Sequence, residues 1–191
     1  VRVRLRVGPM LALLTQLALA APDPGGPGDL APDRDWDLQH LHLDLAIHPD
    51  DPPLANLHGQ DRIITSNEAF EKVVNLAPSP YNGLCYCQGA LAPAGVDVEA
   101  GIRKLAPYIH YSHFRNVSGT ADNFRETFHD NGDLDMAALM RAYRESGFTG
   151  PMRPDHAPSL AGESNGTPGY ETLGKLHAIG YMKGLYEAAQ S

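Results

Sequence analysis

The sequence predicts an α/β domain built on a parallel β-sheet, and two observations support that fold class. From about residue 41, short apolar segments typical of strands alternate with amphipathic segments typical of helices, in the order β-α-β-α-β-α-β-α. Parallel strands need crossover connections, which helices usually supply, so this alternation favours a parallel sheet. The chain has 191 residues, 42% of them hydrophobic, which is enough to form the core of one domain.

Recognisable start and stop signals bound the elements of the first half. Pro49 opens a Pro-Asp-Asp-Pro-Pro segment that ends the first strand. Thr65 and Glu68 have the spacing of a capping box, which opens a helix. Gly89 closes the second strand, and Asp97 caps the second helix. The predicted elements are a strand at 41–48, a helix at 65–77, a strand at 82–87 and a helix at 97–105.

The second half repeats the alternation. The predicted elements are a strand at 108–114, a helix at 133–145, a strand at 148–153 and a helix at 169–189. Gly147 ends the first of these helices, whose apolar face consists of Met136, Leu139, Met140 and Tyr143. The last helix is expected to turn four residues toward the core, namely Leu173, Leu176, Ile179 and Gly180.

Composition narrows the classes of partner. The chain has 15 basic and 23 acidic side chains, a formal charge of −8, and a pI of about 5.5. Nucleic-acid grooves and anionic membrane surfaces are recognised by clustered Lys and Arg, so we expect neither nucleic acid nor a membrane as a partner. Cys85 and Cys87 are two residues apart and poorly placed to bridge each other, so no disulfide framework is expected.

Residues 1–38 differ in sequence pattern from the rest of the chain. Three arginines precede an apolar run at 10–20, which ends in small residues, as in a secretory signal peptide. The run is too short to span a bilayer, which takes roughly 20 apolar residues. The alternatives are a fragment edge, a reading-frame artefact or a stray helix, and we therefore exclude this segment from the functional argument.

Side chains that can bind a metal stand at the end of each predicted strand. His48 ends the first strand, Cys87 ends the second, His113 lies in the third, and Asp155 follows the fourth. In parallel α/β proteins, ligands bind at the carboxyl ends of the strands. Because side chains alternate between the two faces of a strand, these four could meet in one pocket.

Two imidazoles, one thiolate and one carboxylate would suit a divalent cation. With neutral imidazoles their charge is near −2, and the mixture of soft and hard donors favours Fe²⁺, Mn²⁺, Zn²⁺ or Co²⁺ over Mg²⁺ or Ca²⁺. Spacing alone does not decide the matter, because no two of these ligands are close in the sequence. The alternative is a buried cysteine that packs as a small hydrophobe, with some of the nine histidines at strand ends by chance.

Six segments between about residue 43 and the C-terminus carry motifs of a known enzyme family. They occur in order and without large gaps, at 45–53 (LAIHPDDPP), 82–89, 113–117 (HFRNV), 128–136 (FHDNGDLDM), 150–156 (GPMRPDH) and 169–185. Together they resemble mannonate dehydratase, a lyase of hexuronate (glucuronate) catabolism that converts D-mannonate to 2-dehydro-3-deoxy-D-gluconate.

The resemblance implies a xylose-isomerase-like TIM (β/α)₈ barrel, of which the chain would hold about four C-terminal βα units. A complete barrel needs roughly 250 residues. We therefore expect a truncated form, with 1–38 as a segment foreign to the family and 39–191 as the C-terminal half of the barrel. A partial barrel leaves open strand edges, which a homo-oligomer could cover.

The resemblance also implies roles for individual residues. The metal, Mn²⁺ or Fe²⁺, would be held by the four strand-end residues, His48, Cys87, His113 and Asp155. His156 and Tyr170 match catalytic acid–base positions, without an assignment of acid and base. Arg115 and Arg153 would contact the carboxylate or hydroxyl groups of the sugar acid. A thiolate ligand and the family together favour the cytoplasm.

Several alternatives stay open at this point. Arg115 could pair structurally with Asp122 or Glu126, and Tyr170 could simply cap a loop. His129 is expected in a loop over the site, with no role assigned. The chain could also be another metal-dependent sugar or sugar-acid isomerase or dehydratase, or an inactive metal-binding remnant.

Overall fold

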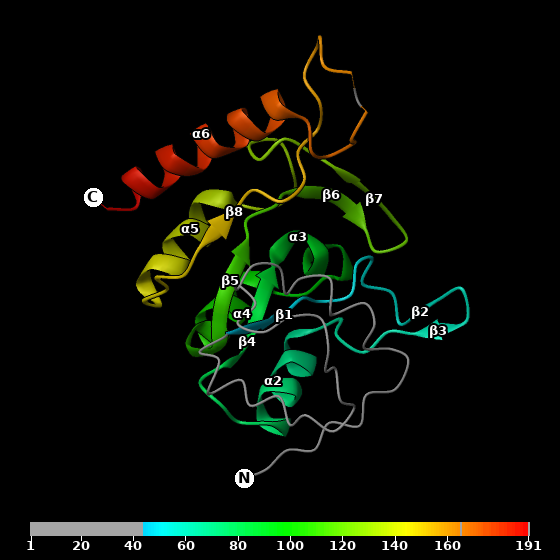
Figure 1. The fold of residues 1–191 in the computed structure, drawn as a ribbon, viewed down its shortest axis with the longest axis vertical. Helices are drawn as coiled ribbons and strands as arrows, with labels where there is room; N and C mark the ends of the chain where they lie inside the picture. Colours follow the sequence, from blue (N-terminus) through cyan, green and yellow to red (C-terminus); the bar gives the residue numbers. More distant parts are fainter. Residues whose placement is uncertain (1–43, 165, 191) are drawn as a thin grey trace, which may run out of the picture. The chain divides into compact units, whose positions relative to one another are not determined.

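A computed structural model describes residues 44–164 and 166–190, so the expectations for residues 1–38 lie outside the described residues. Four parallel strands form the central sheet in the order β1-β4-β5-β8 (Figure 1). They are β1 (Leu45–Ile47), β4 (Asn82–Cys87), β5 (Ile109–His113) and β8 (Met152–Arg153). This order confirms the predicted parallel sheet, in which each strand pairs with the next one predicted along the chain.

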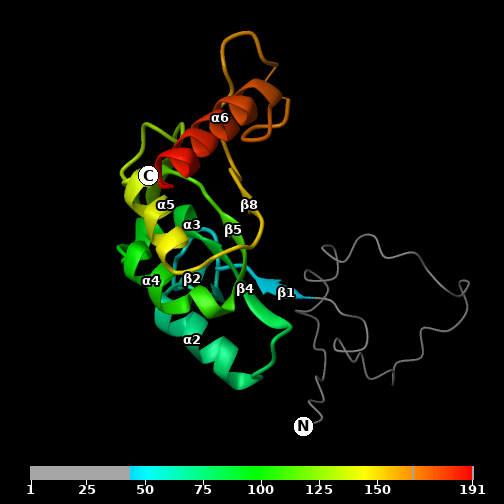
Figure 2. The same ribbon diagram turned by 90° about the vertical axis from the view of Figure 1, so that its left-hand side faces the viewer.

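The helices follow the predicted alternation. They are α2 (Asn67–Leu76), α3 (Gln88–Leu91), α4 (Val98–Leu105), α5 (Met136–Glu145) and α6 (Thr172–Ala188), with short 3₁₀ turns η3 (Ala92–Ala94) and η4 (Ala106–Tyr108). Figure 2 shows α2, α4 and α5 along one side of the strands. None of the described helices is both long and apolar enough to cross a bilayer.

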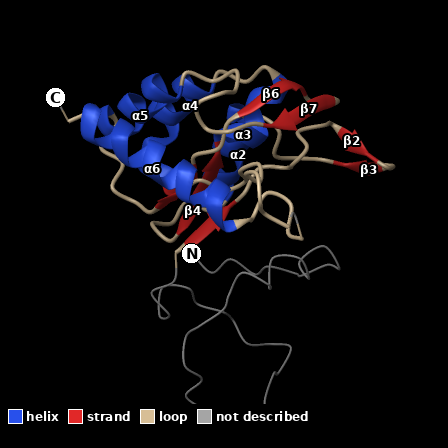
Figure 3. Ribbon diagram, turned by 90° about the horizontal axis from the view of Figure 1, so that it is seen from above, coloured by secondary structure: helices blue, strands red, loops and turns tan. Residues whose placement is uncertain are grey.

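Two antiparallel hairpins were not predicted. They join β2 (Asn56–Leu57) to β3 (Gln60–Asp61) and β6 (Val117–Thr120) to β7 (Asn123–Glu126). Figure 3 shows both hairpins on the same side of the described region, away from α6. Their strands are only two to four residues long, too short for an alternating pattern to reveal them. The second hairpin follows β5 directly and so lies at the carboxyl end of the sheet.

Polar caps set the starts of three helices. Asp97 caps α4 as predicted, because its side chain accepts a hydrogen bond from the Ala100 amide at 2.9 Å. The predicted cap of α2 is wrong by one residue: Ser66, rather than Thr65, accepts from the Ala69 amide at 3.2 Å. Asp135 caps α5, which therefore begins at Met136 and not at residue 133.

The hydrophobic core lies between the sheet and its covering helices. Its fully buried members include Leu84 and Tyr86 of β4, Phe70 of α2 and Tyr143 of α5. Because side chains alternate along a strand, the next residue after Tyr86 points to the opposite face. Cys87 is thereby directed away from the helices, toward the face that carries the candidate site.

The predicted core face of α6 is wrong. Leu173, Leu176 and Ile179 are 45%, 59% and 44% exposed, whereas Gly174 and Ala178 are buried. The apolar residues of α6 are distributed over all of its faces, so the sequence pattern did not single out one face as the buried one. Gly174 fixes the choice, since a Cβ there would lie 2.2 Å from the Pro158 carbonyl oxygen.

The fourth strand is also shorter than predicted. Only Met152 and Arg153 pair with β5, whereas the prediction began at residue 148. Phe148 packs instead against Tyr143, with ring centroids 5.2 Å apart. The short pairing still directs the chain after Arg153 to the carboxyl edge of the sheet, where Asp155 lies.

Candidate metal centre

The four strand-end residues converge on one point. His48 directly follows β1, Cys87 and His113 are the last residues of β4 and β5, and Asp155 lies two residues after β8. One potential ligand atom from each of them lies within 4.8 Å of the other three. The parallel sheet brings these residues together although they are spread over more than a hundred positions of sequence.

The separations within the cluster suit a bound cation. The His48 Nε2 and His113 Nδ1 atoms are 3.1 Å apart, and the Asp155 Oδ2 atom is 3.5 Å from His113 Nδ1 and 3.9 Å from the Cys87 Sγ. In a tetrahedral site with ligand distances of about 2.0–2.3 Å, neighbouring ligand atoms lie roughly 3.3–3.8 Å apart. These three separations lie close to that range, all four ligand atoms lie within 4.8 Å of one another, and the chemistry of the donor set fits a first-row divalent ion.

Burial and neighbouring charged groups together set the protonation of these residues. Burial raises the pKa of the Cys87 thiol, against an opposing effect of the Arg115 charge. Burial and the neighbouring His113 lower the pKa of His48. Burial opposes ionisation of Asp155 too, but hydrogen bonds and charges from His113 and Arg153 outweigh it and lower the pKa of Asp155. A cation would thus meet a neutral His48 and an ionised Asp155, and would displace the thiol proton of Cys87.

A buried histidine holds the backbone beside Asp155. Asp155 adopts a left-handed conformation, φ +58°, which costs a non-glycine residue about 1–3 kcal/mol. The fully buried His129 places its Nε2 2.9 Å from the carbonyl oxygen of Pro154. Asn116, also buried, donates to the His129 carbonyl at 3.0 Å. This arrangement stabilises the strained peptide that directs the Asp155 carboxylate into the cluster.

We therefore expect His129→Leu to weaken metal binding by about 10–100-fold, the usual range when a supporting hydrogen bond is lost. The measurement is the dissociation constant for Mn²⁺ or Co²⁺. His110→Leu is the matched control, because His110 Nδ1 also contacts a backbone carbonyl, that of Leu45, at 2.9 Å, but toward the other end of β5. Equal losses in the two variants would contradict a role specific to the metal centre.

A second group of predicted residues lies beside the cluster. His156 Nε2 is 2.7 Å from the Tyr170 hydroxyl, and the two rings meet edge to face. His156 Nδ1 is 3.1 Å from a carboxylate oxygen of Glu126. His156 is partly exposed and Tyr170 is 49% exposed, so both can reach a molecule bound at this edge.

The two arginines differ in their surroundings. Arg115 is 1% exposed; its Nε donates to Glu126 at 2.9 Å, and its Nη1 donates to Asp51 at 2.5 Å. Of the open alternatives for Arg115, the structure shows pairing with Glu126 and not with Asp122. Arg153 is more exposed, and its Nη2 donates to the Oδ1 atom of Asp155 at 2.7 Å. Sequence reasoning offered Glu126 as a partner of Arg115, but it did not foresee the Asp51–Arg115 pair or the contact between Glu126 and His156.

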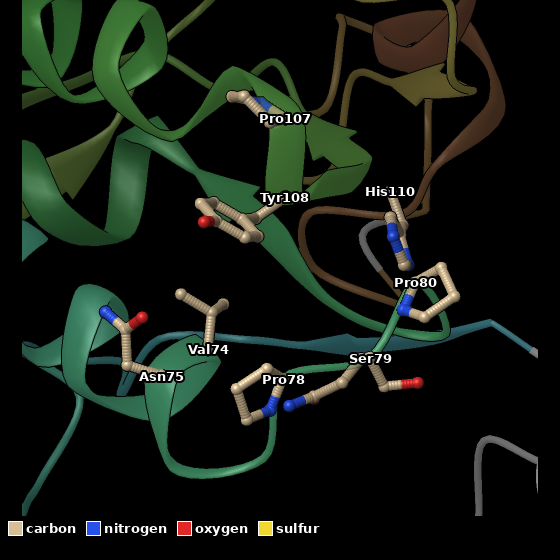
Figure 4. Close-up of a pocket in the computed structure, with 9 residues that line it drawn as sticks. Val74, Asn75, Pro78, Ser79, Pro80, Pro107, Tyr108 and His110 are labelled. Atoms are coloured by element: carbon tan, nitrogen blue, oxygen red, sulfur yellow. The ribbon is translucent and has the colours of Figure 1, made fainter.

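A separate hollow of about 320 Å³ lies at the amino ends of β4 and β5 (Figure 4). Pro78, Pro80 and Pro107 line it, together with Tyr108 and His110. None of the predicted ligands or catalytic residues contributes to this hollow. The predicted ligands lie instead at the carboxyl edge of the sheet.

Fold and site together define a class: an α/β protein of the xylose-isomerase-like TIM-barrel type, with a candidate metal centre at the carboxyl ends of its strands. The fold resembles a xylose isomerase domain protein from Alicyclobacillus acidocaldarius, with a TM-score of 0.61 at 15% identity over 81% of this chain and 54% of that one. The solved mannonate dehydratase from Streptococcus suis serotype 2 gives a TM-score of 0.75 at 37% identity, over 80% of this chain and 45% of that one.

The sequence model of D-mannonate dehydratase (UxuA) matches residues 38–191, and the chain belongs to this family. Mannonate dehydratase 2 of Halalkalibacterium halodurans is 37% identical over 155 residues, which cover 78% of this chain and 44% of the relative. The chain thus spans less than half the length of the curated relatives it matches. The predicted family and the partial barrel are confirmed.

Proposed function

We propose that this chain carries the metal centre and the acid–base pair of a hydro-lyase that converts D-mannonate to 2-dehydro-3-deoxy-D-gluconate in hexuronate breakdown. The observation that carries the proposal is the His48–Cys87–His113–Asp155 cluster, at the carboxyl edge of the sheet in a chain of this family. The chain spans less than half the length of its curated relatives. That its residues catalyse the reaction is therefore itself part of the proposal.

The resident ion would be Mn²⁺ or Fe²⁺. Two imidazoles, a thiolate and a carboxylate would hold it, and a bound ion of this kind supplies Lewis acidity toward the oxygens of a sugar acid. Cys85 and Cys87 are both free thiols, which suits the reducing cytoplasm proposed for the protein.

His156 and Tyr170 would move the protons. Loss of water from a sugar acid requires removal of the C2 proton and protonation of the departing C3 hydroxyl. The 2.7 Å contact between His156 Nε2 and the Tyr170 hydroxyl lets a proton pass between the two groups. Their exposure at the edge of the cluster supports contact with substrate.

Arg153 is the arginine better placed for the sugar acid. Its Nη2 is held by Asp155 at 2.7 Å, and its side chain is 42% exposed, so the guanidinium can also reach a carboxylate or hydroxyl of a bound sugar acid. Arg115, already engaged by two carboxylates, would act on the substrate indirectly, through the groups that it holds in place.

The test is product formation from D-mannonate by the chain loaded with Mn²⁺ or Fe²⁺, alone and mixed with the amino-terminal half of the Streptococcus suis relative. We expect turnover in the mixture, and a loss of about 10²–10⁴-fold in kcat for His156→Gln or Tyr170→Phe with metal content unchanged. Turnover of a different sugar would favour an isomerase or another dehydratase. Metal uptake without any turnover would indicate a non-catalytic remnant.

A further inference from the structure

We propose that Glu126 is a positioning residue that fixes the ring orientation and the tautomer of His156, and that Arg115 in turn holds Glu126. The inference rests on the catalytic role proposed above for His156 and Tyr170. It adds Glu126, which no family motif indicated, to the residues that define the site.

The hairpin β6–β7 brings Glu126 to the site. Glu126 is the last residue of β7, and its strand pairs with β6, which begins four residues after the end of β5. Its Oε1 lies 3.1 Å from His156 Nδ1, and its Oε2 accepts from Arg115 Nε at 2.9 Å. One carboxylate therefore bridges a fixed cation and the proposed catalytic imidazole.

This contact determines where the imidazole proton lies. An ionised carboxylate can only accept hydrogen bonds, so His156 Nδ1 must carry the proton. In the neutral ring, Nε2 then has a free lone pair, and the Tyr170 hydroxyl 2.7 Å away must donate to it. The chain of hydrogen bonds runs in one direction, from Tyr170 through His156 to Glu126, and leaves His156 ready to accept a proton at Nε2.

Arg115 keeps Glu126 ionised and in place. Burial opposes ionisation of Glu126, but the hydrogen bond from His156 and the Arg115 charge outweigh it and lower the pKa of Glu126. The guanidinium itself is buried and anchored on its other side by Asp51. A Cβ at Gly89 would lie 2.6 Å from the Arg115 Cγ, so the stem of Arg115 packs directly on the α3 backbone.

A purely structural role for Glu126 would be to neutralise Arg115. Asp51 performs that task as well, at 2.5 Å from Arg115 Nη1, and none of its hydrogen bonds reaches His156. Asp51→Ala and Glu126→Ala thus each remove one carboxylate partner of the same buried guanidinium. Only the second change removes the acceptor of His156 Nδ1, which makes the two variants a matched pair.

The experiment is ¹⁵N NMR of the histidine-labelled chain without metal or substrate, at a mildly alkaline pH where histidine rings are neutral. His156→Gln identifies the signal of His156 by its disappearance. We expect the Nδ1–H tautomer to predominate in the wild-type chain and in Asp51→Ala. Glu126→Ala should convert His156 to the Nε2–H tautomer, because Nδ1 loses its acceptor and the Tyr170 hydroxyl oxygen can then accept. If Glu126→Ala does not fold, Glu126→Asp keeps the charge for Arg115 but withdraws it by one methylene, and the same conversion is expected.

A wild-type His156 in the Nε2–H form would overturn the proposal. So would an unchanged tautomer in the Glu126 variant that folds, or the same conversion in Asp51→Ala. The tautomer is read without turnover, so absence of D-mannonate dehydration would reject the proposed function and leave this result standing. Conversely, turnover by a chain with the wrong tautomer would reject only the role of Glu126.

Discussion

Replacing Cys87 with alanine should raise the dissociation constant for the metal by more than about 100-fold, beyond the range for loss of a supporting contact. The thiol is the soft donor of the set and lies fully buried at the end of β4, 3.9 Å from the Asp155 carboxylate. Without it, two imidazoles and one carboxylate remain, and the ligand charge falls from near −2 to −1. Equilibrium dialysis with Mn²⁺ and the thiolate absorption of the Co²⁺-loaded chain would measure the loss.

Cys85→Ala is the control for this change. Cys85 lies two residues earlier on the same strand and the same face, is also buried, and lies outside the four-residue cluster. Both substitutions remove one sulfur from the interior, so their packing costs are similar. The metal-centre interpretation would be rejected if Cys85→Ala lost as much affinity as Cys87→Ala, or if Cys87→Ala kept the wild-type affinity.

The convergence of the four candidate metal ligands could be predicted because it depends on two strong regularities. Alternation of strands and helices fixes a parallel sheet, and parity along each strand fixes the face on which a side chain lies. His48, Cys87 and His113 needed only these two rules to be placed together. Placing Asp155 beside them also requires the direction of β8, because Asp155 follows that strand. The parallel pairing of Met152 and Arg153 with β5 sets this direction.

Features that depend on tertiary contacts could not be predicted in the same way. The exposed and buried faces of α6 are decided by the close approach of Gly174 to Pro158, which leaves no periodic signal in an apolar helix. Glu126 reaches His156 through a hairpin whose strands have four residues each, and Arg115 alone could not indicate which carboxylate it would pair with. The residues that support the site are therefore harder to find from sequence than the ligands.

Phe70→Ala should lower the free energy of unfolding by about 3–5 kcal/mol, the usual cost of removing a fully buried aromatic ring. Phe70 is 0% exposed on α2, and its ring lies 5.8 Å from that of Tyr86, the residue that precedes Cys87. The cavity would therefore open directly behind the strand that carries Cys87. Urea unfolding followed by circular dichroism would measure the change, with Leu76→Ala on the same helix, 82% exposed, expected to cost less than about 0.5 kcal/mol.

Metal binding should offset part of the loss in Phe70→Ala. A ligand that binds only the folded state adds roughly 4 kcal/mol of stability when its free concentration is about 1,000 times its dissociation constant. This gain is comparable with the cost of the cavity. Excess Mn²⁺ should therefore raise the urea midpoint of Phe70→Ala, but should have no such effect in a double variant that also carries Cys87→Ala. Equal rescue of the double variant would mean that the ion stabilises the folded chain at a site other than the Cys87 cluster.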